Sequence, residues 1–519
     1  MMLHGSSARI EGEPGKAPQR FSFPHLSTKL EDNRIVICAG GCLPVSFLCM
    51  QRSTRRSALL VVLSLLAGCV SFQPKPILPS ETITAFESRT LDDPSLERFL
   101  EINLKHEVQP WPLGSWNLGL LIQAAFYYHP DLDVARARWA VAEAGVITVG
   151  HRPNPSVGFS PIYVSNAAGN TLPWVLGLNF DMPIETAGKR GYRIAQARQL
   201  SAAAQFNIAM VAWQVRSHVR ASLLSLLAAE RAAVIVQRRL GLDETIIKFL
   251  EQRLTFGEIS QPEVTQAHIA LNQDQLTLRD LQKQGAEARV QLAAALGLPV
   301  SALEHVAITF DPLEQPPNAK ALPDRDVRRY ALTNRPDLLS ALADYEATQA
   351  ALQLEVAKQY PDLRLSTGYS WELGENRWWL PNISLALPVF NQNQGPIAAA
   401  EARRQEAAAR FKALQAQVVA ETDRALASTQ AALNKLATAD ALLAAQEKQR
   451  QVAQTMFKAG ETDRLALTSA QLEYETAALA RLNANIQAQQ ALGLLEDAVL
   501  RPLDESEAPP FSTKTNPGR

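Results

Sequence analysis

The sequence predicts a mainly α-helical chain with membrane-type β-strands, built from two copies of one helix–β-hairpin–long helix–helix unit. Three observations predict this fold class. Landmarks recur at a nearly constant shift along the chain. Apolar and polar residues alternate over strand-length segments. Two stretches of about 65–70 residues keep a helical pattern, which at 1.5 Å per residue gives helices of roughly 100 Å.

The duplication rests on four landmarks that keep their order and spacing, so chance is a poor explanation. They recur at shifts of 203–206 residues as His129-Pro130-Asp131-Leu132 and Arg335-Pro336-Asp337-Leu338, Pro155 and Pro361, Pro183-Ile184 and Pro388-Val389, and Phe256-Gly257-Glu258 and Ala459-Gly460-Glu461. We infer two repeats, 115–310 and 322–500.

Long helices are expected at about 187–256 and 396–458. Each is matched by half-length helices of about 35 residues, expected as continuous over 116–150, 262–298, 326–360 and 463–497. Two such helices placed end to end equal one long helix, which indicates a layered tube of antiparallel coiled coils. A solvated coiled-coil rod is the alternative that the helices alone leave open.

Strands are predicted where alternation has a period of two, over 174–182, 363–371 and 379–387, with another after Pro155. Alternation over about ten residues is typical of transmembrane β-strands, although soluble hairpins packed on a helix show it too. Four strands cannot close in a bilayer, and bacterial barrels begin at about eight. We therefore expect a homotrimer with a twelve-stranded β-barrel, continued by a long α-helical barrel.

The N-terminus contains a signal-like segment in an unexpected place. Residues 50–68 combine a basic start with an apolar run too short to span a membrane, and Leu66-Ala67-Gly68-Cys69 resembles the bacterial lipobox. We predict a lipoprotein signal peptide at 50–68, a lipid anchor on Cys69 and, since Val70 follows, delivery to the outer membrane. An ordinary cleaved signal, or a short buried helix, is the alternative.

The other terminal segments follow from this interpretation. We expect translation to start at Met50, so that 1–49 is a mis-assigned start, a removed segment or a disordered extension. Residues 69–114 are expected to form a linker with a short helix near 96–104, and 501–519 a disordered tail. The four cysteines all lie within the first 69 residues, and we do not take the spacing of Cys38 and Cys42 as a metal motif.

Several function classes find no support in the sequence. Lys+Arg (51) and Asp+Glu (52) nearly cancel, which argues against a nucleic-acid surface. There is no phosphate loop and no HExxH, and the eight histidines include no i,i+4 pair. We assign no catalytic residue, no metal ligand and no cofactor apart from the lipid, and expect a passive conduit rather than an enzyme.

The layout resembles the TolC family of outer membrane efflux proteins over nearly all of 110–500. The resemblance rests on the repeated Pro-Asp-Leu segments, the strand-to-helix prolines and the helical turns at Gly257 and Gly460. It implies a trimeric channel in the outer membrane that extends into the periplasm. There it would meet a periplasmic adaptor protein and an inner-membrane RND-type pump.

Two regions are singled out by the resemblance. The strand–helix junctions look like the heavy-metal-efflux (CzcC-like) branch, and we expect the basic side chains there to be solvated; the residues are Pro183, Gly188, Lys189, Arg190, Pro388 and Gly395. The periplasmic tip, where the adaptor would bind, is assigned to Gly257, Glu258, Glu263, Gly460, Glu461 and Asp463.

The tip carboxylates have two interpretations. In the resemblance they ring the narrowest aperture and favour cations; alternatively, Glu263 and Asp463 are simply acids that suit a helix start. The chain also departs from some drug-efflux relatives, because it has Ala466 and Ser469 where those have tip aspartates. An aspartate gate is therefore not expected here.

The leading hypothesis for function is the outer-membrane channel of a tripartite efflux system, with heavy-metal cations as one cargo. Multidrug or other small-molecule efflux by the same architecture remains open. A periplasmic adaptor or scaffold lipoprotein is a different class, which the duplicated strand pairs oppose. A cytosolic coiled-coil protein is a third, which the signal opposes.

Overall fold

A computed structural model describes residues 71–165, 169, 172–315, 324–372 and 375–503. The chain separates into two compact units, and the second begins at Arg89. The described part of the first unit, 71–88, contains the helix α2 (Pro79–Glu87), which begins with proline at its first position. Proline suits that position because its missing N–H has no helical partner there.

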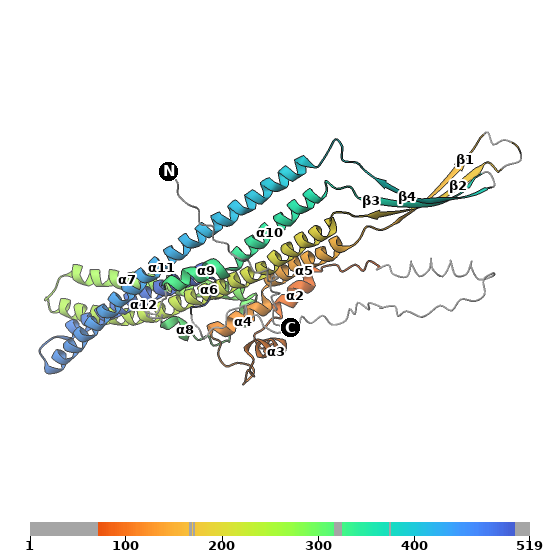
Figure 1. Cartoon of the computed structure of the whole chain (residues 1–519). Helices are drawn as coiled ribbons and strands as arrows, with labels where there is room; N and C mark the ends of the chain where they lie inside the picture. Colours follow the sequence, from red (N-terminus) through yellow and green to blue (C-terminus); the bar gives the residue numbers. More distant parts are fainter. Residues whose placement is uncertain (1–70, 166–168, 170–171, 316–323, 373–374, 504–519) are drawn as a thin grey trace, which may run out of the picture. The chain divides into compact units, whose positions relative to one another are not determined.

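The second unit runs twice through the same order of elements (Figure 1). After α3 (Pro94–Leu104), the first run consists of α4 (Leu118–Tyr128), α5 (Pro130–Gly150), β1 (Ser156–Tyr163), β2 (Trp174–Ile184), α6 (Lys189–Thr255) and α7 (Gln261–Leu296). After the short η1 (Val300–Leu303) and α8 (Asp311–Glu314), the second run consists of α9 (Asp324–Asn334), α10 (Pro336–Ala357), β3 (Leu363–Glu372), β4 (Glu375–Leu385), α11 (Gln394–Ala459) and α12 (Arg464–Val499).

Two of the four half-length helices are broken, so the expectation of continuous helices over 116–150 and 326–360 is wrong. The breaks fall at His129 and Arg335, whose backbones are extended at ψ 121° and 127°. Pro130 and Pro336 follow them, and a proline restricts the preceding residue to extended backbone. The local chemistry therefore divides each expected helix into a short and a longer piece.

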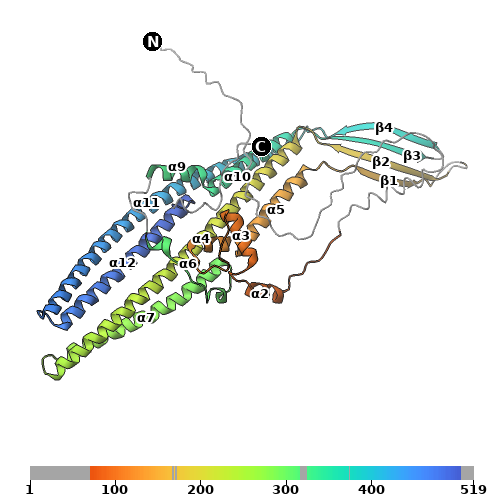
Figure 2. The same cartoon turned by 90° about the horizontal axis from the view of Figure 1, so that it is seen from below.

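The four strands form one antiparallel sheet in the order β1-β2-β3-β4, which joins the two repeats through β2 and β3 (Figure 2). The alternation predicted over 174–182 and 363–371 is confirmed, and it gives one mainly apolar and one mainly polar face. The alternation predicted over 379–387 is wrong at Trp379, which the bulge places opposite Gly368 on the polar face, and β4 ends at Leu385. The return strand starts earlier than expected, at Glu375, because the polar residues before Trp378 also pair with β3. A bulge lies between the pairs formed by Ser366 and Gly368.

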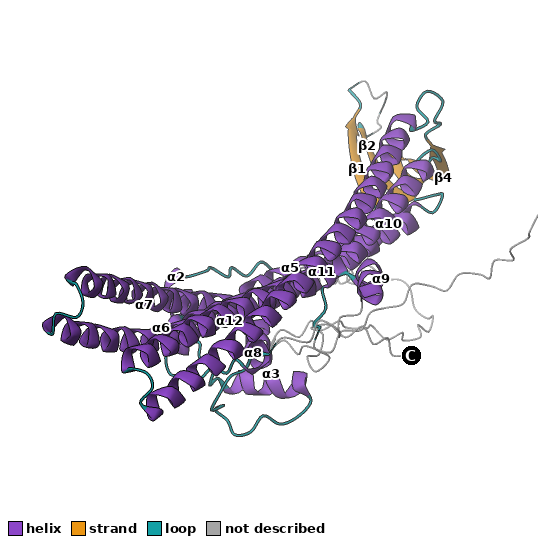
Figure 3. Ribbon diagram, turned by 90° about the vertical axis from the view of Figure 1, so that its left-hand side faces the viewer, coloured by secondary structure: helices purple, strands orange, loops and turns teal. Residues whose placement is uncertain are grey.

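Much of the second unit packs around α6, which contacts α4, α5, α7, α10 and α12. The α6–α7 and α11–α12 hairpins turn at the end of this unit that is opposite to the strands (Figure 3). Side chains of α6 fill much of the core, where Val219, Leu223 and Val236 are fully buried. Within the described ranges, no helix combines the length and apolar character that crossing a membrane requires.

Candidate functional site

The two hairpin turns have the same backbone conformation. Gly257 and Gly460 adopt left-handed φ angles of 72° and 77°. In each turn the next residue's N–H bonds back to the last helical turn: Glu258 to Arg253 O at 2.9 Å, and Glu461 to Met456 O at 2.9 Å. This is the Schellman pattern, in which glycine avoids the clash that a Cβ would meet at positive φ.

Three of the acidic residues assigned to the tip have local partners. Glu263 accepts from the Ser260 N–H and hydroxyl in a capping box, and these hydrogen bonds hold its pKa below the usual value. Asp463 caps α12 by accepting from the Ala466 N–H at 2.8 Å. Glu258 pairs with Arg253 at 3.0 Å. The helix-start chemistry therefore accounts for Glu263 and Asp463 without a pore.

An aromatic residue at the first tip was not singled out by the sequence. Phe256 directly precedes Gly257, and 78% of it is exposed. The aligned residue of the second repeat is Ala459, so the two tips differ in apolar surface. Comparing the two repeats could have identified Phe256, because the aligned position changes from phenylalanine to alanine.

The first strand–helix junction is held by ionic contacts. Gly188 is left-handed at φ 72° and precedes α6. The expectation that the basic cluster is solvated is wrong for Lys189, which is only 6% exposed. Its Nζ donates to Asp362 Oδ1 and to Tyr360 O, both at 2.7 Å. The partners lie more than 170 residues away in the sequence, so local patterns gave no sign of them.

The neighbouring side chains extend this ionic junction. Burial disfavours the charged form of Asp362, but hydrogen bonds from Lys189 and Thr186 outweigh it and hold its pKa below the usual value. Arg193 binds Glu185 through two nitrogens, at 2.5 and 2.9 Å. Arg190 Nε donates to Gly150 O at 2.6 Å. This arrangement ties the start of α6 to the end of α5 and the start of β3.

The segment of the second junction, 388–395, contains no charged residue and is largely exposed. Its left-handed residue is Asn393, at φ 65°, whereas Gly395 lies inside the first turn of α11. Asn393 Nδ2 donates to the Glu355 backbone and carboxylate oxygens at 2.8 and 2.9 Å. After Pro388 the chain exposes Phe390 completely. A groove of about 720 Å³ is lined by residues of both junctions, among them Lys189, Arg193, Leu387 and Phe390.

The sheet presents two chemically different faces. Apolar side chains line one face in every strand, as in the cross-strand sets Phe159–Leu178–Tyr369 and Met182–Leu365–Ile383. The other face carries polar contacts: Asp181 with Arg364 at 3.5 Å and with Ser366 at 3.1 Å. Near the turns, the aromatic pairs Tyr163–Trp174 and Tyr369–Trp378 have ring centroids 5.2 and 4.8 Å apart. Strands of 8–11 residues with this pattern suit a bilayer.

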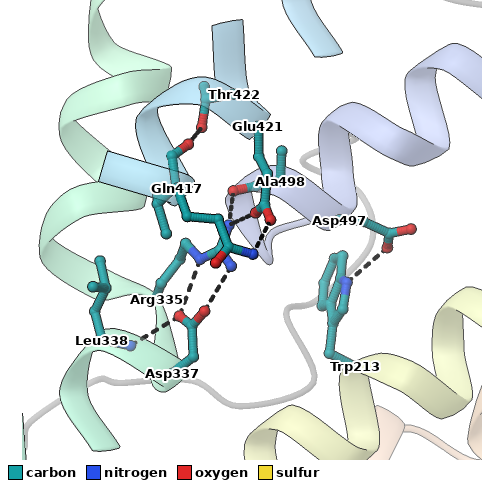
Figure 4. Close-up of polar contacts among 10 residues, drawn as sticks. Trp213, Arg335, Asp337, Leu338, Gln417, Glu421, Thr422, Asp497 and Ala498 are labelled. Carbon is teal, nitrogen blue, oxygen red and sulfur yellow. Dashed lines mark hydrogen bonds and ion pairs between the residues drawn. The ribbon is translucent and has the colours of Figure 1, made fainter. Parts of the chain in front are cut away.

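Two groups of polar contacts link helices of the second unit (Figure 4). Arg335 binds Asp337 at 2.6 Å, Glu421 at 3.3 Å and Ala498 O at 2.6 Å, which links α10, α11 and α12. Trp213 of α6 donates to Asp497 of α12 at 2.8 Å. These contacts position helices, and they identify no reaction centre. In the sequence, Arg335 stands out only as part of a repeated Pro-Asp-Leu segment.

Other predicted sites lie outside these contacts. Four of the predicted sites and segments lie outside the described residues: Cys69, the signal segment 50–68, the extension 1–49 and residues 504–519 of the tail. In the part of the chain that the structure describes, no group of three or more His, Cys, Asp or Glu side chains could hold a metal ion.

Comparison with known proteins agrees with this arrangement. The model of the family described as outer membrane efflux protein matches residues 121–298 and 327–499. The pyoverdine export outer membrane protein OpmQ of Pseudomonas aeruginosa is 26% identical over 313 residues, covering 56% of this chain. The cobalt-zinc-cadmium resistance protein CzcC of Cupriavidus metallidurans is 27% identical over 271 residues, covering 51% of this chain. The matches span 65% and 62% of these relatives' own lengths, slightly less than two thirds.

Solved structures show the same fold. CusC, whose structures concern transmembrane channel formation, aligns with a TM-score of 0.59 at 20% identity, over 76% of this chain and 95% of CusC. The outer membrane protein VceC of Vibrio cholerae aligns with a TM-score of 0.60 at 20% identity, over 75% of this chain and 97% of VceC.

Proposed function

Because the chain belongs to the outer membrane efflux protein family, we propose that it is the outer-membrane channel of a tripartite efflux system. In this role it conducts substrates passively from an inner-membrane pump and a periplasmic adaptor to the exterior. The observation that carries the proposal is the joining of an amphipathic four-stranded sheet to helices of 67 and 66 residues in one unit. The alternative of a periplasmic adaptor or scaffold does not explain this sheet.

The proposed assembly is a homotrimer. Strands β1 and β4 are the edges of the sheet, and a bilayer offers no partner for unpaired edge groups. Since the strands alternate in direction, β4 of one protomer runs antiparallel to β1 of the next under rotation about a common axis. Three copies supply twelve strands with the apolar face toward lipid and the polar face, including Asp181 and Arg364, toward the pore.

The hairpin turns are the proposed contact with the adaptor and, through it, with an RND-type pump. The turns at Gly257 and Gly460 lie at the end of the second unit opposite to the strands. An exposed Phe256 supports binding there, because apolar side chains at a rigid turn make effective contact points. Glu258 and Glu461 add carboxylates beside the two glycines.

An N-terminal lipid on Cys69 is the proposed membrane anchor. It is supported by the basic, apolar and lipobox segments of 50–69. A Cys69→Ser variant is expected to lose incorporation of radiolabelled palmitate while the wild-type protein keeps it. Equal labelling of both proteins would overturn the anchor and leave the channel proposal standing.

Heavy-metal cations are the cargo we propose first, supported by the first junction, 183–193, and by the likeness to CzcC. Export of a small organic molecule is the second candidate, and the likeness to OpmQ favours it. Deletion of the gene should sensitise cells to the class of compound that is exported. Panels of divalent metals and of organic toxicants would separate the two candidates.

The channel itself is tested by fractionation and conductance. The full-length protein is expected in the outer-membrane fraction, to migrate as a heat-modifiable oligomer, and to produce discrete conductance steps in planar bilayers. A wholly soluble chain without conductance would overturn the proposal. A membrane-bound monomer would overturn the trimer.

A further inference from the structure

The two strand–helix junctions are equivalent by duplication, yet only one of them is covered. At the shift of 205 residues, Gly188 aligns with Asn393, and both adopt the left-handed conformation. Lys189 aligns with Gln394. Lys189 is buried at 6% exposure, whereas Gln394 is exposed. Lys189 is therefore enclosed within one chain, whereas Gln394 is exposed even though the adjacent Asn393 is bound to Glu355 of α10.

The cover of the first junction is the start of β3, which belongs to the other repeat. Thr186 donates through its N–H to Asp362 Oδ1 at 3.0 Å and through its hydroxyl to Pro361 O at 2.7 Å. Lys189 donates to Tyr360 O and to Asp362. These contacts continue the pairing of β2 with β3, whose last pair is Ile184 with Leu363. The covering segment is 360–362.

The segment aligned with 360–362 is also uncovered. It is 154–156, with the sequence Asn-Pro-Ser, and its last residue, Ser156, is the first residue of the edge strand β1. All three residues are exposed. The open second junction follows the other edge strand, β4. The two exposed segments therefore lie at opposite edges of the sheet: 154–156 at β1, and the second junction after β4.

We propose that residues 389–394 of one protomer dock on residues 154–156 of a second copy of this chain. The contact repeats the geometry of the first junction. In it, Asn391 takes the place of Thr186 against Pro155, and Gln394 takes the place of Lys189 against Asn154. This inference rests on the proposed homotrimer and specifies the residues that form the seam.

The charges at the two junctions support this pairing. The ion pair of Lys189 with Asp362 is replaced at the aligned positions by Gln394 and Ser156, so both charges are absent together. If Gln394 faced a different segment, there would be no reason for both positions of the ion pair to be uncharged. An amide and a hydroxyl can still hydrogen-bond, and neither leaves a buried charge without a partner.

The apolar surface agrees with the same partner. Phe390 is completely exposed and Val389 is 66% exposed, next to β4. Val157, which would face Val389 across the seam, is 68% exposed. The Glu185–Arg193 pair of the first junction is replaced at the aligned positions by Phe390 and Ala398. The interface between copies is thus apolar where the contact inside the chain is ionic.

Helix packing shows the same gap. Helix α6 packs against α5 of its own repeat and α10 of the other repeat. Helix α11 packs against α10 of its own repeat, but in the described part of the chain it makes no extensive contact with α5, the counterpart of α10. The α5 helix of a second copy fills that place, and it ends at Gly150, separated by three residues from 154–156.

Disulfide cross-linking of the full-length protein in outer-membrane vesicles tests the seam. The double variant Asn391→Cys with Pro155→Cys is expected to form dimers and trimers on non-reducing gels after mild oxidation. The matched pair Thr186→Cys with Pro361→Cys occupies the aligned positions inside one chain and is expected to cross-link only within the monomer. Each single-cysteine variant controls for the four native cysteines, all at or before position 69.

A charge series gives an independent measurement. Gln394→Lys alone places an unpaired charge in the seam and is expected to lower the melting temperature of the trimer by several degrees. Adding Ser156→Asp recreates the pair found at Lys189 and Asp362 and is expected to restore it. Adding Ser160→Asp, elsewhere on β1, is expected to give no rescue.

The outcomes separate this inference from the proposed function. Intermolecular cross-linking together with charge rescue supports the seam. Intact trimers that fail both tests overturn the seam and leave the channel standing. Absence of any oligomer in wild-type vesicles overturns the trimer and the seam together.

Discussion

Buried charges hold the helices of the two repeats together. Arg216 of α6 is 1% exposed and binds Glu496 of α12 at 3.0 Å, and Arg220 approaches the same carboxylate at 3.5 Å. Burying such charges without their partners is costly, whereas exposed pairs contribute little. At the residue scale, removing one partner of an enclosed ion pair is therefore expected to cost more stability than removing one partner of a surface pair.

Replacing Glu496 tests this dependence. Glu496→Ala leaves two buried guanidinium groups without their carboxylate and is expected to destabilise the fold by about 3–5 kcal/mol. Glu406→Ala removes the exposed i,i+4 pair with Arg410 and should cost about 0.5 kcal/mol or less. Thermal unfolding followed by circular dichroism compares the two. Equal losses in both variants would contradict the argument.

A second residue-scale prediction concerns a pair of carboxyl groups between α6 and α7. Asp243 and Asp274 are 6% and 7% exposed, and Arg239 lies 3.1 Å from Asp274. Burial, and then the nearby Asp274, raise the pKa of Asp243 to about 6. Because the folded pKa lies above the unfolded value, the protonated site stabilises the fold at low pH. That contribution is lost as the pH rises through about 6.

Asp243→Asn should remove this pH dependence. The variant is expected to be more stable than wild type at pH 8, by on the order of 3 kcal/mol at most, and to match it near pH 4. Melting temperatures measured from pH 4 to 8 check the difference. The neighbouring exposed Glu244→Gln is the matched control. A wild-type protein whose stability does not fall between pH 5 and 7 relative to Asp243→Asn would refute the assignment.

At the scale of elements, glycine and proline decide where helices turn and break. Pro130 and Pro336 divide the helices before the strands, and left-handed glycines end α6 and α11. No atom lies within 4 Å of a Cβ added at Gly460, so a substitution there meets no steric barrier from its neighbours. The backbone conformation alone sets its cost.

Gly460→Ala is expected to destabilise the α11–α12 turn by about 1 kcal/mol, and Gly460→Asn by less, since Asn tolerates the left-handed region. Gly241→Ala, in the middle of α6 and equally free of neighbours, should instead stabilise by about 0.5–1 kcal/mol. Hydrogen exchange of the turn amides measures the first effect and thermal unfolding the second. The same sign for both alanine variants would contradict the conformational explanation.

At the scale of the whole molecule, the apolar and polar faces of the sheet suit different environments. Leu178 lies in the middle of β2 on the apolar face, and the adjacent Asn179 points to the polar face. Such alternation suits a sheet that contacts lipid on one face and water on the other. The proposed barrel provides both environments at once.

A lysine scan across this pair tests the placement. Leu178→Lys is expected to cost about 2–4 kcal/mol and to reduce the heat-modifiable oligomer, because the charge enters the bilayer. Asn179→Lys is expected to preserve the oligomer and to change the ion selectivity of the conductance. If the lysine at 179 abolished the oligomer and the lysine at 178 did not, the assignment of the faces would be reversed.

Features that depend on neighbours along the chain can be predicted from residue order. The duplication, the alternation of β2 and β3, the long helices and the turns at Gly257 and Gly460 follow from residue order and local backbone preference. The breaks at Pro130 and Pro336 belong to this class too, since the prolines were visible, although the surrounding helical pattern suggested continuity.

Features that depend on distant partners require the folded arrangement of the chain. Lys189 is buried because Asp362 and Tyr360 lie against it, and Arg335 because Glu421 and Ala498 do. A charged side chain at a helix start is normally solvated, and burial becomes favourable only when an acceptor is brought within hydrogen-bond distance. That proximity is created by the pairing of β2 with β3 and by helix packing, which no local pattern of residues encodes.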